Sequence, residues 1–221
     1  RCNWRLNSVT STQVPCQAPR SSDNVHFMAP AFTGTAHTVV IDQNSNCHNM
    51  TWDNAITAAQ NVRLTGATLA VQLDIYGSLD LAANVNVNGF NGFLRFTATQ
   101  LGVVTFRSRG KEWLLHTLEI ALSGGAELQL LDPLTVENRV ANNRRQDEGR
   151  ILLSSGHFNT NGQTVSADYF QSNNNTNTRQ LTLDNSTFVV DGHNAGNDGT
   201  SAWFINFNAS NNAGFSAAGS H

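Results

Sequence analysis

Carboxylates and arginines gather between residues 132 and 150, where they could act as acid, base and anion-binding groups on a polysaccharide. The acidic candidates are Asp132, Asp147 and Glu148, and the basic candidates are Arg139, Arg144, Arg145 and Arg150. A polysaccharide lyase or hydrolase needs carboxylates, or a calcium site, together with a basic residue on one face. A solvated loop with weakly paired charges explains the same residues. We favour that interpretation because Lys111 is the only lysine and no Asp cluster recurs along the chain. The chain is therefore predicted not to be an enzyme.

The segment DGHNAGNDG at residues 191–199 could place oxygen ligands around a calcium ion. Its candidate ligands are Asp191, Asn194, Asn197 and Asp198. The segment does not have the spacing of an EF-hand loop, and turns rich in Asn, Asp and Gly are common without a metal. We therefore expect no cofactor, with calcium as the weaker alternative. The sequence shows no Ser-His-Asp grouping and no phosphate-binding glycine loop.

Three cysteines, Cys2, Cys16 and Cys47, lie in the first quarter of the chain, and none forms a C-x-x-C pair. A zinc site needs more ligands at closer spacing, so one disulfide in an oxidising compartment is the better interpretation. We favour a disulfide between Cys16 and Cys47, which would tie an N-terminal cap to the first turns of the fold. A disulfide between Cys2 and Cys16 is the alternative, and spacing does not decide between them.

The composition bounds the partners of the chain. A formal net charge of -3 gives no large basic field, so nucleic acid is not expected as a partner. No apolar run approaches the roughly 20 residues that cross a bilayer, so membrane insertion is not expected. Only 13% of the residues are charged, and Asn, Thr, Ser and Gln supply most of the polar surface. This composition is typical of secreted β-rich proteins, and it predicts an extracellular or cell-surface location.

The elements that position these candidate groups are expected to be short strands. Residues 156–190 repeat a short alternating run after a Gly- or Asn-rich corner. The runs lie at residues 164–167, 180–183 and 187–190. Strands this short, separated by irregular polar corners, favour an all-β solenoid in which each turn of the chain stacks on the previous one. The expected inward side chains are Leu79 and Leu81, Leu128 and Leu130, and Leu181 and Leu183.

We expect one domain over residues 1–221. Residues 1–35 have little periodicity and are predicted to form an irregular cap, since the first turn of a solenoid otherwise exposes an open core. Residues 36–221 are predicted to form the stacked turns, with a protruding charged loop near 137–150. Residues 111–125 contain helical spacings, but Leu118, Ile120 and Leu122 alternate, which favours a strand.

Several segments, in this order, resemble the N-terminal β-solenoid region of Bacteroidetes-type cell-surface proteins exported by the type IX secretion route. The segments that carry the resemblance are NW at 3–4, VPC at 14–16, SDNVHF at 22–27, CHNMTW at 47–52, LDIYGSLDL at 73–81, FLRFTAT at 93–99, residues 158–192 and the segment around Trp203. The resemblance implies a right-handed parallel β-helix in a surface adhesin, stalk or matrix protein. It also implies further turns beyond this segment in such proteins.

The preferred function is thus a non-enzymatic structural or adhesive module of a cell-surface or self-assembling fibre protein. The expected partners are other copies or further modules of the same surface protein. The expected contact residues are the aromatics near the end of the chain, namely Trp203, Phe204, Phe207 and Phe215. A carbohydrate-binding module is the alternative, with glycans bound by exposed amides and by Trp and Tyr; burial of Trp52, Trp113 and Trp203 would argue against it. A polysaccharide lyase or hydrolase is third.

Overall fold

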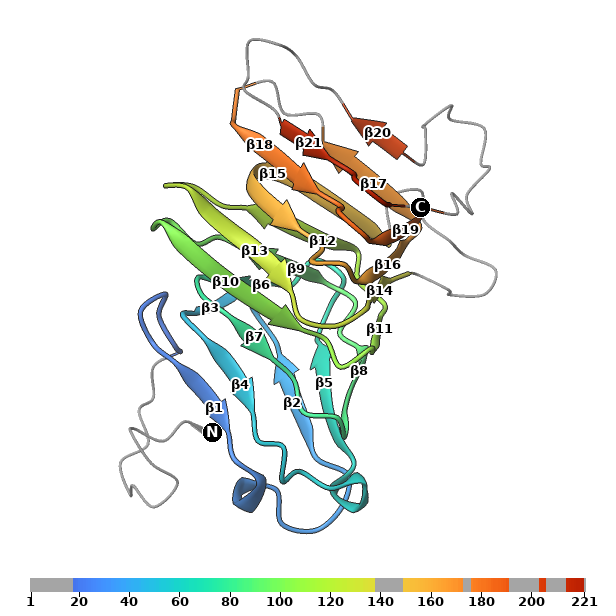
Figure 1. Cartoon of the computed structure of the whole chain (residues 1–221). Coiled ribbons are helices and arrows are strands. Elements are labelled where there is room, and N and C mark those ends of the chain that lie inside the picture. Colours follow the sequence, from blue (N-terminus) through green and yellow to red (C-terminus); the bar gives the residue numbers. More distant parts are fainter. Residues whose placement is uncertain (1–17, 138–148, 173–175, 191–202, 206–213, 221) are drawn as a thin grey trace.

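The computed structural model describes residues 18–137, 149–172, 176–190, 203–205 and 214–220. Within these residues the fold contains β-strands and two short 3₁₀ turns, η1 (Ala29–Ala31) and η2 (Ala58–Gln60), and no α-helix. Every strand pairing is parallel, and the strands stack into a column that runs from the N-terminal to the C-terminal turns (Figure 1). The chain is therefore a parallel β-solenoid, as the sequence predicts.

The strands form three walls, named A, B and C in the order in which the chain visits them. Wall A consists of β1 (Val25–Phe27), β4 (Met50–Trp52), β7 (Leu79–Asp80), β10 (Gly102–Arg107), β13 (Ala126–Leu130), the end of β15 (Arg150–Asn159), β18 (Arg179–Thr182) and β21 (Gly214–Ser216). Wall B consists of β2 (Thr38–Ile41), β5 (Val62–Gly66), β8 (Val85–Gly89), β11 (Glu112–Trp113), β14 (Leu134–Val136), β16 (Thr164–Ala167) and β19 (Thr187–Val190). Wall C consists of β3 (Ser45–Cys47), β6 (Gln72–Ile75), β9 (Phe93–Phe96), β12 (Thr117–Ala121), the start of β15, β17 (Tyr169–Ser172) and β20 (Trp203–Ile205).

The long strand β15 joins two walls. Its first residues pair with β12 and β17 in wall C, and its last residues pair with β13 and β18 in wall A. The bend falls at Gly156, whose φ is +82°. A Cβ at this position would collide with the side chain and backbone of Leu122. Glycine is therefore required here both for the backbone angle and for the close approach of the preceding turn.

Alternation along each strand fills the interior with apolar rows. In wall A, Val104, Leu128, Phe158 and Leu181 follow one another in register. The last three are at most 1% exposed. The predicted inward leucines are all buried at 5% exposure or less: Leu79, Leu81, Leu128, Leu130, Leu181 and Leu183. The alternating pattern in the sequence thus correctly predicts which of these side chains point inward.

Several corners use the left-handed backbone region, which asparagine tolerates better than most residues. Asn61, Asn161 and Asn185 have φ values of 45°, 53° and 56°. The Asn161 amide also donates to the Leu130 carbonyl of the preceding turn at 3.0 Å. The Asn-rich corners therefore support both the bends and the stacking between turns.

The predicted strands at 164–167 and 187–190 coincide with β16 and β19, and the strand interpretation of 111–125 is confirmed by β11 and β12. One boundary differs. The first strand, β1, and the turn η1 lie inside residues 1–35, the range predicted as an irregular cap. Residues 1–17 and most of the predicted charged loop, 138–148, lie outside the described residues. The right-handed sense of winding stays a prediction.

Candidate functional site

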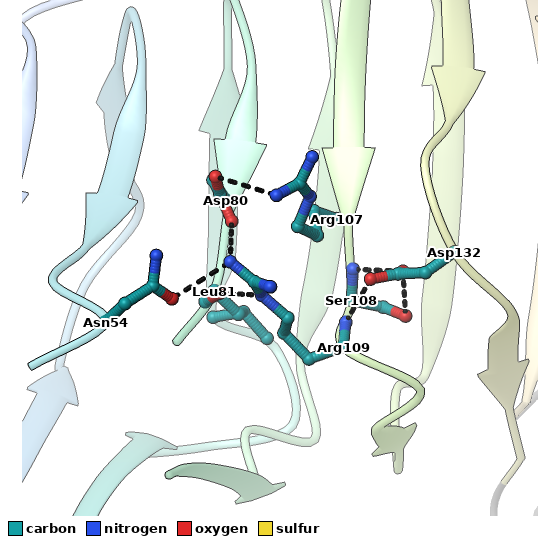
Figure 2. Close-up of polar contacts among 7 residues, drawn as sticks. All are labelled: Asn54, Asp80, Leu81, Arg107, Ser108, Arg109 and Asp132. Atoms are coloured by element: carbon teal, nitrogen blue, oxygen red, sulfur yellow. Dashed lines mark hydrogen bonds and ion pairs between the residues drawn. The ribbon is translucent and has the colours of Figure 1, made fainter. Parts of the chain in front are cut away.

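The acidic candidate Asp132 lies at the corner after β13 and holds that corner to the preceding turn. Its Oδ1 accepts hydrogen bonds from the Ser108 backbone N–H at 2.8 Å and from the Ser108 hydroxyl at 2.9 Å. Its Oδ2 accepts the Arg109 backbone N–H at 2.8 Å. Both carboxylate oxygens are therefore engaged in fixing the corner, as Figure 2 shows.

Arg109 extends this contact across earlier turns (Figure 2). Its Nε donates to the Leu81 carbonyl at 2.8 Å, and its Nη2 donates to Asn54 Oδ1 at 2.9 Å. The same Nη2 reaches Asp80 Oδ1 at 3.3 Å, and Arg107 Nη1 lies 3.9 Å from Asp80 Oδ2. Because the charges bind one another and the backbone, the arrangement is a brace along the column rather than a set of groups aimed at a substrate.

The predicted catalytic grouping does not assemble among the described residues. Asp132 belongs to the corner between walls A and B, whereas Arg150 begins β15 in wall C. Arg150 donates to Thr117 Oγ1 at 3.2 and 3.3 Å and to Gln171 Oε1 at 3.3 Å. The other candidates of this group lie outside the described residues: Arg139, Arg144, Arg145, Asp147 and Glu148.

The calcium candidates Asp191, Asn194, Asn197 and Asp198 also lie outside the described residues. Among the residues that the structure does describe, no three His, Cys, Asp or Glu side chains come together as a metal site.

Cys47 is the one cysteine in the described part of the chain. Its thiol is free and 1% exposed, on the inward side of β3, and burial raises its pKa to about 12. Cys2 and Cys16 lie outside the described residues, so the predicted disulfide between Cys16 and Cys47 stays a prediction.

Wall A carries a carboxylate, an imidazole and a hydroxyl in contact on its outer face. Glu127 Oε2 lies 3.0 Å from His157 Nδ1, and His157 Nε2 lies 2.9 Å from Thr182 Oγ1. Asn159 donates to Glu127 Oε1 at 2.8 Å. The order resembles a nucleophilic triad. The neighbouring strands use their backbone N–H groups in the sheet, so the described residues offer no oxyanion hole beside it. The contact is best explained as a polar ladder between stacked strands.

Wall C carries a second outward polar row, in which Asn46, Asp74, Arg95 and Glu119 follow one another in register. Arg95 Nε lies 3.6 Å from Glu119 Oε2. Gln72 donates to Asp74 Oδ1 at 2.7 Å, and burial raises the pKa of the Asp74 carboxyl despite this bond.

The two ends of the column differ in how they cover the core. At the N-terminal end, Phe27 stacks on Trp52 with ring centroids 3.9 Å apart, and Phe32 lies parallel to Trp52 at 6.3 Å. At the C-terminal end, Trp203 contacts Phe170 and Phe188 at 4.9 and 5.2 Å.

Trp203 nevertheless remains 37% exposed, and Phe215 on β21 is 52% exposed. Of the other predicted contact residues, Phe207 lies outside the described residues, and only the backbone of Phe204, in β20, is described.

Two of the tryptophans proposed for glycan binding are unavailable for it. Trp52 is 3% exposed and Trp113 is 0% exposed, so both belong to the core. Only Trp203 keeps a solvent-facing surface among these three.

Comparison with protein-family models, with curated proteins and with solved structures finds no match for this chain. The resemblance to type IX secreted surface proteins therefore stays a prediction. Among the residues that the structure describes, no helix has the length and apolar character needed to cross a membrane.

The polar rows on walls A and C were missed in the sequence because their members come from different turns of uneven length. Glu127 and His157, for example, lie on β13 and near the end of β15, with β14 and the start of β15 between them in the sequence. An alignment of successive turns on their buried leucines would have placed these polar residues beside one another.

Proposed function

We propose that the chain is a non-enzymatic extracellular structural and adhesive module that associates with a second copy through its C-terminal end. One observation carries the proposal: in walls A and C, an inward row that is buried in the preceding turn ends in an exposed aromatic side chain. In wall A, Phe158 and Leu181 are 0% and 1% exposed, whereas Phe215, next in the row, is 52% exposed. In wall C, Phe170 is 0% exposed and Trp203 is 37% exposed.

The strand edges at this end support the same proposal. Within the described residues, β19, β20 and β21 each pair with one earlier strand only. An unpaired edge beside exposed apolar side chains is a surface on which another strand can add. Strands β20 and β21, which carry Trp203 and Phe215, lie at the C-terminal end of the column (Figure 1).

We choose a second copy of this chain as the partner, because it requires no molecule other than the chain itself. Two C-terminal ends present the same apolar rows and the same strand edges, so they can meet about a two-fold axis with the edge of one wall paired antiparallel to its counterpart and the edges of the other two walls paired with each other. Among the described residues the first strands β1, β2 and β3 are also paired on one side only, but their inward Val25, Ile41 and Cys47 are 5%, 5% and 1% exposed. We therefore expect pairs joined at their C-terminal ends.

The non-enzymatic and extracellular parts of the proposal draw on different support. The carboxylates of Asp80 and Asp132 both bind Arg109 and hold neighbouring turns together. We therefore assign them a structural role rather than a catalytic one. A surface built from Asn, Thr, Ser and Gln with one lysine is typical of secreted β-rich proteins.

Sedimentation velocity over a wide range of protein concentration tests the association. The native chain should shift from monomer to dimer with rising concentration. The double variant Trp203→Ser with Phe215→Ser should weaken dimerisation by at least about tenfold, because the exposed aromatic surface at the centre of the contact is lost. Leu101→Ser is the matched control, since Leu101 is 85% exposed at the corner before β10, away from the end.

The double variant should keep the circular dichroism spectrum of the native chain, because both side chains lie at the last strands. A native chain that stays monomeric at the highest concentration would overturn self-association and would leave a further module of the same surface protein as the partner. Equal loss of dimer in the Leu101→Ser control would overturn the assignment of the contact to the C-terminal end.

A further inference from the structure

The outward row on wall C combines charged and amide groups at the spacing of stacked strands. Asn46, Asp74, Arg95 and Glu119 occupy matching positions on β3, β6, β9 and β12. Successive members are therefore separated by about 4.8 Å along the column. Their strand neighbours point inward, since Ile75, Phe96 and Ile120 are 0% exposed. The row thus offers acceptor, donor and acceptor groups in regular order on one lateral face.

Hydrogen bonds within the protein leave part of this row unsatisfied. Arg95 Nε is shielded from solvent and has no hydrogen-bond partner among the described residues; its contact with Glu119 is an ion pair at 3.6 Å. Asn46 Oδ1 is likewise shielded and without a hydrogen-bond partner in the described part of the chain. Both atoms are shielded, so an external ligand does not reach them. The accessible groups of the row are the side chains of Arg95 and Glu119, which are 35% and 26% exposed. Glu119 Oε1 also accepts a hydrogen bond from the Ser154 hydroxyl at 2.7 Å.

An aromatic ring lies beside the row. Phe93 precedes Arg95 by two residues on β9, so both side chains are on the outer face of wall C. Phe93 is half-buried and contacts the His116 ring with centroids 4.4 Å apart. An aromatic face next to a line of hydrogen-bonding groups can pack against an apolar face of a ligand while the polar groups bind its edge.

The charges on this face favour some classes of ligand over others. A free anion is disfavoured because the carboxylates of Asp74 and Glu119 flank Arg95 on both sides. A cation is disfavoured by the arginine between them. A peptide strand would have no edge to join, since β6 and β9 are paired on both sides. Sugar hydroxyls both donate and accept hydrogen bonds, and the C–H face of a sugar ring packs on aromatic rings.

We propose that the outer face of wall C binds a neutral polysaccharide, with Arg95, Asp74 and Glu119 bonded to its hydroxyls and Phe93 beneath a sugar ring. The flat, repeating face suits an extended chain that contacts several turns at once. This lateral site is separate from the C-terminal contact and does not depend on the proposed self-association.

Depletion binding of the folded chain to cellulose, chitin, starch and an insoluble β-1,3-glucan tests the proposal. At least one polysaccharide should retain the native chain, and Arg95→Gln should weaken that binding by about tenfold or more, since a charge-assisted hydrogen bond is lost. Phe93→Leu should weaken it too, while preserving an apolar side chain. Arg63→Gln, the same substitution at an exposed position on wall B, should bind like the native chain.

Three results would overturn the proposal. Retention by none of the four polysaccharides is one, and equal weakening by Arg95→Gln and Arg63→Gln is another. The third is loss of retention in about 1 M salt, where charges are screened within about 3 Å, because binding would then rest on net charge rather than on hydroxyl contacts. The Trp203→Ser and Phe215→Ser double variant should bind the polysaccharide like the native chain, which keeps this test separate from that of self-association.

Discussion

The two ends of the solenoid differ in how far their inward apolar side chains are covered. At the N-terminal end, Val25, Trp52 and Phe32 are 5%, 3% and 9% exposed, and aromatic stacking covers the first turns. At the C-terminal end, Trp203 and Phe215 are 37% and 52% exposed although they continue inward rows. Among the residues that the structure describes, the chain covers most of the first turn, while Trp203 and Phe215 at the last strands stay exposed.

This difference follows from the way a stacked fold is stabilised. Each turn buries its apolar side chains only against the turns before and after it, so an end turn has half the neighbours of an interior one. A segment of different character must cover that surface, or another molecule must. At the N-terminal end, η1 (Ala29–Ala31) and Phe32 provide such a segment.

Thiol reactivity should show the largest contrast between the ends. Cys47 lies on β3, the first strand of wall C, and burial raises its pKa to about 12. A cysteine introduced by Trp203→Cys lies on β20, the last described strand of the same wall, at a 37% exposed position. With the chain reduced, we expect Cys47 to react with iodoacetamide on the order of a thousandfold more slowly, since the thiolate is the reactive form.

Peptide mass spectrometry locates each modified cysteine and so separates Cys47 from Cys2 and Cys16. Similar rates at Cys47 and at the introduced cysteine would contradict a closed N-terminal end. Mapping of the unreduced chain also tests whether Cys16 is bonded to Cys47.

Core truncation should give the next largest contrast. Trp52→Ala removes a ring that is 3% exposed and stacked on Phe27, and should lower the free energy of unfolding by about 3–5 kcal/mol. Trp203→Ala removes a ring that is 37% exposed, so the loss in the monomer should be less than half as large. Urea unfolding at a concentration where the chain is monomeric measures both. Equal losses would show that the C-terminal end is as well covered as the N-terminal one.

The pH dependence of the N-terminal end should give the smallest effect. The backbone N–H groups of Ala55 and Ala29 donate to the Asp53 carboxylate at 2.9 and 3.1 Å and lower its pKa. A carboxyl whose pKa is lower in the folded chain contributes stability above its unfolded value of about 3.9, and this contribution is lost as the pH falls through the folded value.

Asp53→Asn should therefore be less stable than the native chain near neutral pH, and the difference should close as the pH drops below about 4. Asp42→Asn, at an exposed carboxylate, is the control and should change stability little. A difference that stays constant from neutral to acid pH would show that the charge of Asp53 does not support the N-terminal turns.

The sequence predicts the strands well where local alternation controls them. Residues 164–167 and 187–190 form the expected strands because each places apolar side chains inward and polar side chains outward at a spacing of two. The buried leucine pairs follow for the same reason. The first strand falls inside the predicted cap although residues 24–27 alternate, because the rest of residues 1–35 has little periodicity.

The candidate sites could not be predicted in the same way. The polar row through Asp74, Arg95 and Glu119 depends on which residues of different turns come into register, and the uneven corners hide that register. Exposure of Phe215 is equally invisible in a local pattern, because its inward position is the same as that of Leu181 and only the next turn distinguishes them. Long-range stacking, not local preference, determines both.

Electron microscopy of the purified native chain, carrying a compact tag at its N-terminus, tests the central claim most directly. The open C-terminal end predicts rods of twice the monomer length with a tag at each outer end. The double variant Trp203→Ser with Phe215→Ser should give single rods with one tag. Native material that forms only single rods at high concentration, or pairs joined at the tagged ends, would contradict a closed N-terminal end and an associating C-terminal end.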